Sequence, residues 1–235
     1  MNYKRWYVKI KKMLLVVFLP LIMSNSASAA LALDATRYIY NGSTSFISAI
    51  ANNESDEMYG GQVWIDNITE SDTRPTFVTT PSFFKINGNS RQVFRIMKMS
   101  DHMPKDKESI YWLNLQEIPQ ANKGSGLSMA IRTRVKLIYR PEAIVKGRSG
   151  AEKNMTIQHL PGQQWLVNST PYIFAISEVF DNKNKPLAFN KVDSDKLTMF
   201  MPGDKVNVTG KIVNSVRALS DYGNLETYIL KNPIK

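Results

Sequence analysis

Apolar and polar residues alternate along most of the chain after residue 30, and this period of two is typical of β-strands rather than helices. The Asn-Gly pairs at residues 41–42 and 87–88 predict tight turns, the second of them within a hairpin. About seven strands in roughly 112 residues have the spacing of an antiparallel sandwich. The strand pattern covers residues 31–43, 44–55, 60–70, 77–99, 109–119 and 126–141.

The composition changes after Pro141, where residues 142–154 are polar, contain glycine and are typical of a linker. Strand patterns then resume in a shorter second part of the chain. We therefore expect two β domains, residues 30–146 and residues 147–235. The second set of expected strands comprises residues 155–160, 163–170, 172–180, 196–212 and 225–230.

Residues 1–29 have the pattern of a secretory signal peptide. A basic segment comes first, an apolar run over residues 13–23 follows, and small residues end in Ala27-Ser28-Ala29. An uncleaved membrane anchor is the alternative, but a bilayer-spanning helix needs about 20 apolar residues. We expect cleavage after Ala29 and export of the mature chain.

Charge and residue types exclude several functions. The net charge of +10 falls to about +5 without the basic leader, which is too small an excess to indicate nucleic-acid binding. Cysteine is absent and histidine occurs twice, so thiol catalysis, a zinc site and a His-dependent triad are disfavoured. No Gly-x-Ser-x-Gly motif of an exported hydrolase is present. We expect no enzyme, cofactor, metal or small-molecule substrate.

Residues 126–141 predict an unusually long strand. From Leu127 to Tyr139 it would extend about 40 Å, whereas ordinary strands are about half as long. On a strand, Leu127, Met129 and Ile131 project together. Such an apolar edge is prone to aggregation unless a partner strand covers it. Ser128, Ala130, Arg132, Arg134 and Lys136 project the other way.

The sequence resembles the periplasmic chaperones of the chaperone–usher pathway, which escort pilus or fimbrial subunits. The stretch "LALDATRYIYNG" is similar to their first strand, "DKESIYWLNLQEIP" to their Glu-Ile-Pro segment and "KLIYRP" to the end of their seventh strand. In the second domain "VNSTPYIFAI" and "SDYGN" are similar to an Asn-x-Thr-Pro-Tyr strand and an Asp-Tyr-Gly turn. The stretch "PSFFKINGNSRQVFRIM" is similar to another segment of the family, but Asn87 stands where that segment usually has proline.

The resemblance implies an all-β fold of two immunoglobulin-like sandwiches set in an L or boomerang shape. It also implies donor-strand complementation, in which the chaperone lends its seventh strand to a subunit that lacks one and delivers the subunit to an outer-membrane usher. Leu127, Met129 and Ile131 match the positions that enter the subunit groove. Arg37 and Lys136 match the cations that hold the subunit's C-terminal carboxylate.

Three further residues match an interdomain ion network in this family: Glu108, Arg140 and Asp221. The alternative function is a structural pilus subunit or adhesin with immunoglobulin-like domains. A subunit lacks one strand and carries an N-terminal donor extension, whereas here the first strand begins almost at the expected cleavage site. The chaperone is therefore the favoured interpretation.

Overall fold

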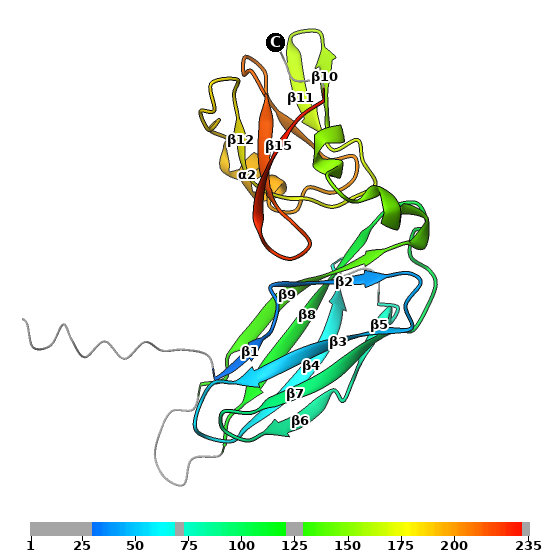
Figure 1. Cartoon of the computed structure of the whole chain (residues 1–235), viewed down its shortest axis with the longest axis vertical. Helices are drawn as coiled ribbons and strands as arrows, with labels where there is room; N and C mark the ends of the chain where they lie inside the picture. Colours follow the sequence, from blue (N-terminus) through cyan, green and yellow to red (C-terminus); the bar gives the residue numbers. More distant parts are fainter. Residues whose placement is uncertain (1–29, 69–72, 121–128, 232–235) are drawn as a thin grey trace, which may run out of the picture.

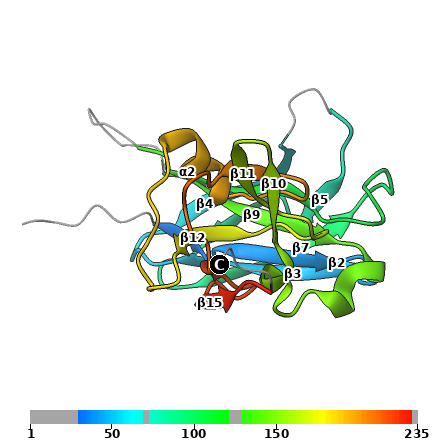
Figure 2. The same ribbon diagram turned by 90° about the horizontal axis from the view of Figure 1, so that it is seen from above.

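The computed structural model describes residues 30–68, 73–120 and 129–231, and these form two β-sandwiches joined at one corner (Figure 1). The expected all-β fold with two immunoglobulin-like domains is confirmed. The second sandwich stands above β2 and β9 of the first, at an angle to it (Figures 1 and 2). The predicted signal peptide lies outside the described residues. Within the described ranges, no helix is long and apolar enough to cross a membrane.

The first sandwich packs a four-stranded sheet against a five-stranded sheet, in the orders β1-β3-β7-β5 and β2-β9-β8-β4-β6. The side chains between the sheets form its core, in which Tyr40, Phe94, Leu113 and Leu137 are almost completely buried. The strands are β1 (Leu31–Leu33), β2 (Arg37–Asn41), β3 (Phe46–Asn53), β4 (Tyr59–Asn67), β5 (Phe77–Thr80), β6 (Phe83–Ile86), β7 (Arg91–Lys98), β8 (Ser109–Ile118) and β9 (Arg132–Arg140).

The first predicted strand, residues 31–43, is divided between the two sheets, and this corrects the prediction. β1 pairs antiparallel with β3, whereas β2 pairs parallel with β9. The division occurs at Asp34, whose backbone N–H donates to the Ile50 carbonyl at 3.0 Å while its carboxylate accepts from the Ile50 N–H at 2.9 Å. Because β1 joins the other sheet and β2 pairs with β9 only from Lys136 onward, the first part of β9 has no neighbouring strand on this side among the described residues.

Neither Asn-Gly pair forms the expected hairpin. The strands on each side of Gly42 and Gly88 belong to different sheets, so both turns connect the two layers of the sandwich. Glycine is needed there for close approach. A Cβ atom on Gly42 would lie 2.9 Å from the Tyr139 hydroxyl, and one on Gly88 would lie 2.1 Å from the Asp56 carbonyl oxygen.

The second sandwich consists of two three-stranded sheets, β10-β11-β13 and β12-β14-β15. The strand pattern over residues 196–212 gives only the short strand β13, because its start belongs to a helix capped by Asn190, whose side chain accepts from the Asp193 N–H. Strand β14 was not predicted. The elements are β10 (Thr156–Leu160), β11 (Gln163–Val167), β12 (Ala175–Phe180), α2 (Lys191–Leu197), β13 (Lys205–Asn207), β14 (Ser215–Leu219) and β15 (Leu225–Ile229).

The segment between the sandwiches is packed rather than a loose linker. It contains two 3-10 helices, η2 (Glu142–Gly147) and η3 (Ala151–Asn154), and it buries Arg148 and Glu152. A small apolar cluster also joins the two sandwiches: Ile110 and Ile138 of the first pack with Ile173 of the second. The sandwiches are thus held by both apolar and ionic contacts.

Candidate functional site

Strand β9 has an open edge beside the junction of the two sandwiches. β8 pairs with β9 from Arg132 to Tyr139, but β2 pairs with it only from Lys136 onward. Among the described residues, no strand pairs with Arg132–Val135 on the β2 side, so these backbone groups can accept another strand. The prediction that the strand begins before Arg132 is wrong for residues 129–131, which lie outside β9.

The predicted groove residues lie at the beginning of this edge. Met129 is 66% exposed and Ile131 is half-buried, whereas Leu127 lies outside the described residues. Farther along β9, Val135 packs against the sandwich core, and Leu137 is within it. One face of the segment therefore passes from an exposed apolar surface into the protein's own core.

Glu117 fixes the start of the edge and was missed as a site residue. Its buried carboxylate accepts hydrogen bonds from the backbone N–H of Leu31 at 2.8 Å and of Ile131 at 3.4 Å. The Glu117 N–H also donates to the Ile131 carbonyl at 2.9 Å. A signal was available, because on β8 an acid follows Leu113 and Leu115 at an inward-facing position.

Two arginines support β9 from the outer face of its sheet. The guanidinium of Arg132 lies 5.4 Å from the ring centre of Trp64, and that of Arg134 lies 5.5 Å from that of Trp112. Arg134 Nε also donates to the buried Asn114 side chain at 3.2 Å. These cations are solvent-facing, as expected, yet each covers a tryptophan.

Arg37 and Lys136 occupy paired positions on β2 and β9. They line a cleft of about 290 Å³ between the sandwiches, whose opposite wall includes Ala175, Ser177 and Thr198. Lys136 Nζ donates to the Thr198 carbonyl at 2.6 Å, while the buried Nε of Arg37 has no hydrogen-bond partner in the described structure. Within that same part of the chain, neither cation forms an ion pair.

Burial lowers the pKa of both cations. Desolvation lowers the pKa of Lys136, and the neighbouring charge of Arg37 lowers it further. Desolvation also lowers the pKa of Arg37, although Asp221 opposes that effect. Two like charges held together without a direct ion pair among the described residues indicate a site for a negatively charged group.

A second cavity, here called the trough, follows the open edge. It has a volume of about 550 Å³ and is lined by residues 31–37, by Thr133 and Val135 of β9, and by residues 221–223 of the second sandwich. Arg37 lines both the trough and the cleft. A strand lying along the edge would therefore end at the two cations.

The three residues of the expected ion network lie together at the junction. Arg140, which is 5% exposed, donates from Nε to Glu108 at 2.6 Å and from its two terminal nitrogens to Asp221 at 2.7 and 3.0 Å. Glu108 is 2% exposed, and its other oxygen accepts from the Ile173 N–H at 2.7 Å. The network thus connects the start of β8 and the end of β9 with the segment before β12 and with the turn between β14 and β15.

Comparison with known proteins identifies the family. The model of the pili and flagellar-assembly chaperone, PapD N-terminal domain, matches residues 30–145. Chaperone protein ClpE of Escherichia coli is 52% identical over 87% of this chain and 78% of that protein. The chain belongs to the pilus-assembly chaperone family. Chaperone protein FanE of Escherichia coli is 44% identical, with 89% of this chain and 94% of that protein covered.

Solved chaperones have the same fold. The periplasmic chaperone SfaE is 29% identical with a TM-score of 0.66, and the alignment covers 85% of this chain and 97% of SfaE. Chaperone DraB of E. coli, at 23% identity, has a TM-score of 0.67, with 87% of this chain and 97% of DraB covered. The family is one of chaperones rather than of enzymes. Within the described residues, no cluster of His, Cys, Asp and Glu could hold a metal ion.

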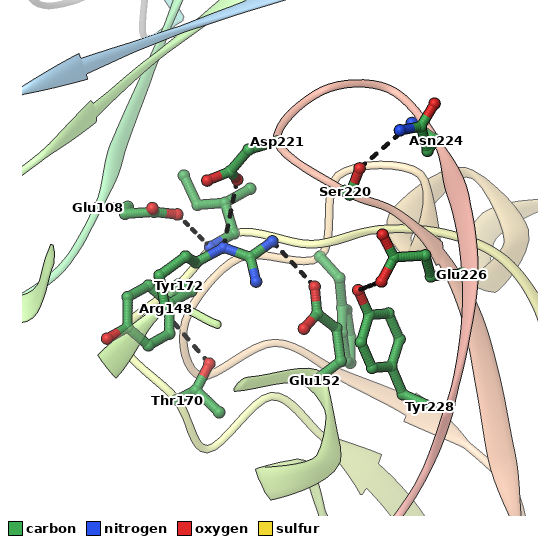
Figure 3. A network of polar contacts seen from close by, with 12 residues as sticks. Glu108, Arg148, Glu152, Thr170, Tyr172, Ser220, Asp221, Asn224, Glu226 and Tyr228 are labelled. Atoms are coloured by element: carbon green, nitrogen blue, oxygen red, sulfur yellow. Dashed lines mark hydrogen bonds and ion pairs between the residues drawn. The ribbon is translucent and has the colours of Figure 1, made fainter. Parts of the chain in front are cut away.

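The ion network of this chaperone is larger than the resemblance implied. The buried Arg148, from the segment between the sandwiches, approaches Glu152 at 2.9 Å and Asp221 at 3.4 Å (Figure 3). Neither contact has hydrogen-bond geometry, so charge rather than directional bonding holds this part together. The composition of residues 142–154 is typical of a linker. The burial of Arg148 and Glu152 shows that this segment is part of the ion network between the sandwiches.

Burial and the neighbouring charges act in opposite directions on the pKa values of the network. Burial alone would raise the pKa of Asp221, but the hydrogen bonds and charge of Arg140, with the charges of Arg148 and Arg37, lower it below its usual value. Burial works against the charge of Arg140, yet Asp221 and Glu108 together raise its pKa. Burial raises the pKa of Glu108 against the opposing charge of Arg140.

Proposed function

We propose that this protein is a periplasmic chaperone that captures pilus or fimbrial subunits by donor-strand complementation. The open edge of β9 beside Arg37 and Lys136 carries the proposal. The segment before the edge supplies Met129 and Ile131, and in our proposal Leu127, to the groove of the subunit. The unpaired backbone of Arg132–Val135 supplies the hydrogen bonds of an added strand.

The position of the cations gives the direction of the added strand. A client chain that follows the trough and ends at Arg37 and Lys136 runs from the start of β9 toward its end. It is therefore parallel to β9, as β2 is over the following residues. The client strand and β2 would then lie end to end beside one long strand.

The cationic pair suits a C-terminal carboxylate. A carboxylate accepts charge-assisted hydrogen bonds from both side chains, and these are stronger than neutral ones. Fixing the chain end also fixes the register, because a slip of one residue would turn every client side chain to the other face. In this proposal Arg37 and Lys136 thus set the register of the client strand against β9, and with it the face to which each client side chain points.

Export and delivery complete the proposal. The signal peptide of residues 1–29, cleaved after Ala29, would bring the chain to the periplasm. There the chaperone would deliver its subunit to the outer-membrane usher. Related structures support subunits as partners, since one is the Salmonella enterica SafA pilin in complex with the SafB chaperone.

Co-expression with fimbrial subunits of the same organism tests the function. A subunit that accumulates and co-purifies with the wild-type chaperone, and is degraded without it, is the expected result. If every subunit remains equally soluble and abundant without the chaperone, the proposal is wrong. Purification from the periplasmic fraction with Ala30 as the first residue would test export and cleavage.

A further inference from the structure

The turn between β14 and β15 places an exposed aromatic ring at the trough. Tyr222 lies in this turn and is 92% exposed. It lines the trough together with Arg37, Thr133 and Val135. No hydrogen bond or ring contact of Tyr222 occurs within the described part of the chain. The ring therefore adds nothing to the packing of its own sandwich.

The backbone of this turn is held firmly. The N–H of Ser220 donates to the Asn224 carbonyl at 2.8 Å, and that of Gly223 donates to the Ser220 carbonyl at 3.0 Å. Asp221 is fixed from the other side by the two terminal nitrogens of Arg140. The exposure of Tyr222 is thus not that of a loose loop, and its side chain projects from a backbone that is held in place.

The turn also contacts the first sandwich beside the cationic pair. A Cβ atom on Gly223, whose φ is +82°, would lie 3.2 Å from the Thr36 hydroxyl, and Thr36 immediately precedes Arg37. The second sandwich therefore brings an aromatic ring to one end of the trough. The apolar side chains of Leu31, Leu33 and Val135 also line the trough, together with polar and charged ones that include Asp34 and Thr133.

We propose that Tyr222 is a specificity-determining residue, forming the wall of a subsite for the side chains just before the client's C-terminal carboxylate. This inference rests on the proposed function, because it requires a client chain that ends at Arg37 and Lys136. The subsite would take an apolar or aromatic side chain, which gains contact with the ring. An acidic side chain would leave the apolar wall with a desolvated charge.

Short fluorescent peptides of alternating valine and threonine test the inference. They end in phenylalanine or aspartate, each as the free acid and as the amide, and anisotropy measures their binding to the full chaperone. We expect the wild type to prefer phenylalanine. Tyr222→Ala should weaken the phenylalanine peptide about three- to tenfold and abolish this preference. Tyr222→Phe should bind like the wild type.

Phe83→Ala is the matched control, because Phe83 is 62% exposed on β6 and does not line the trough. The acid–amide difference reports Arg37 and Lys136 separately. If Tyr222→Ala keeps that difference and still prefers phenylalanine, the inference is wrong and the proposed function stands. If Tyr222→Ala loses the acid–amide difference as well, Tyr222 acts through the turn and the inference is also wrong. A wild type without an acid–amide difference overturns both.

Discussion

Arg37 and Lys136 lie opposite each other on two parallel strands, and both line the cleft between the sandwiches. They are ninety-nine positions apart in the sequence, and the parallel pairing of β2 with β9 brings them together. This pairing starts at the same two residues, so the cations mark the point where the open edge of β9 ends. A client chain that forms the next part of the ladder must therefore end beside them.

Removing either cation should abolish stable client capture. A hydrogen bond to a charged group contributes roughly 1.5–3 kcal/mol, and about 1.4 kcal/mol changes affinity tenfold. Arg37→Ala and Lys136→Ala should therefore each weaken a free-acid peptide more than tenfold and leave an amidated peptide nearly unchanged. Arg132→Ala, which removes a cation from the outer face of the same strand, is the control. Equal binding of acid and amide by the wild type would show that no carboxylate is recognised.

Client affinity should fall at high pH. A carboxylate needs the protonated form of Lys136, and burial with the charge of Arg37 lowers the pKa of this lysine. Affinity for a free-acid peptide should decline as the pH rises through that lowered pKa, below the ordinary lysine value of about 10.4. Lys136→Arg should bind more weakly at neutral pH, because a planar fork replaces a point charge. Its affinity should stay constant up to pH 10, and a decline matching that of the wild type would contradict the role of Lys136.

Acidic substitutions at the start of the edge should block capture without unfolding the chaperone. Met129→Asp and Ile131→Asp would each place a carboxylate in the apolar groove of a subunit, where an unpaired charge is strongly unfavourable. Pull-down of a subunit should fail, while circular dichroism and thermal melting stay close to those of the wild type. Met129 is the sharper site, since it is largely exposed. Normal capture by both variants would exclude this face from the groove.

Removing Arg140 should lower the free energy of unfolding far more than removing a surface arginine. It would leave the buried Glu108 and the partly buried Asp221 without their main partner, and breaking such a pair costs about 3–5 kcal/mol. Arg217, which pairs with Glu178 at a largely exposed site, is the control, and its loss should cost about 0–1 kcal/mol. Urea unfolding of Arg140→Ala and Arg217→Ala compares the two. Similar losses would mean that the network contributes no more than a surface pair.

Small-angle scattering of Arg140→Ala tests the geometric role of the network. We expect the two sandwiches to sample a wider range of angles than in the wild type, because among the described residues only Arg140 bonds to both Glu108 and Asp221. An unchanged scattering curve would mean that the apolar contacts of Ile110, Ile138 and Ile173, rather than Arg140, hold the angle between the sandwiches.

The alternation of apolar and polar residues was sufficient to predict two β domains, and the positions of most strands in the first one. It failed where the chain changes sheets, because the strand-forming residues on both sides of Asp34 have the pattern of one continuous strand. It also failed at the start of residues 196–212, where the cap at Asn190 begins a helix before the apolar pattern starts. Local pattern contains no information about which sheet a strand joins.

The pairing of distant charges could not be worked out from the residues themselves. Arg37, Lys136, Glu108, Arg140 and Asp221 came from a resemblance, and the structure brings each group together in space. Glu117 could have been found, since a carboxylate at an inward-facing strand position requires a buried partner. Arg148 and Tyr222 had no such signal, because their roles depend on where the second sandwich lies.

The contacts between the sandwiches have a consequence for inheritance. Glu108, Ile110, Ile138 and Arg140 of the first sandwich are buried where the two sandwiches meet. A recombination event that exchanged residues 147–235 between distant relatives would set these side chains against a surface that did not evolve with them. We therefore expect the two sandwiches to change together in evolution, although each has its own core.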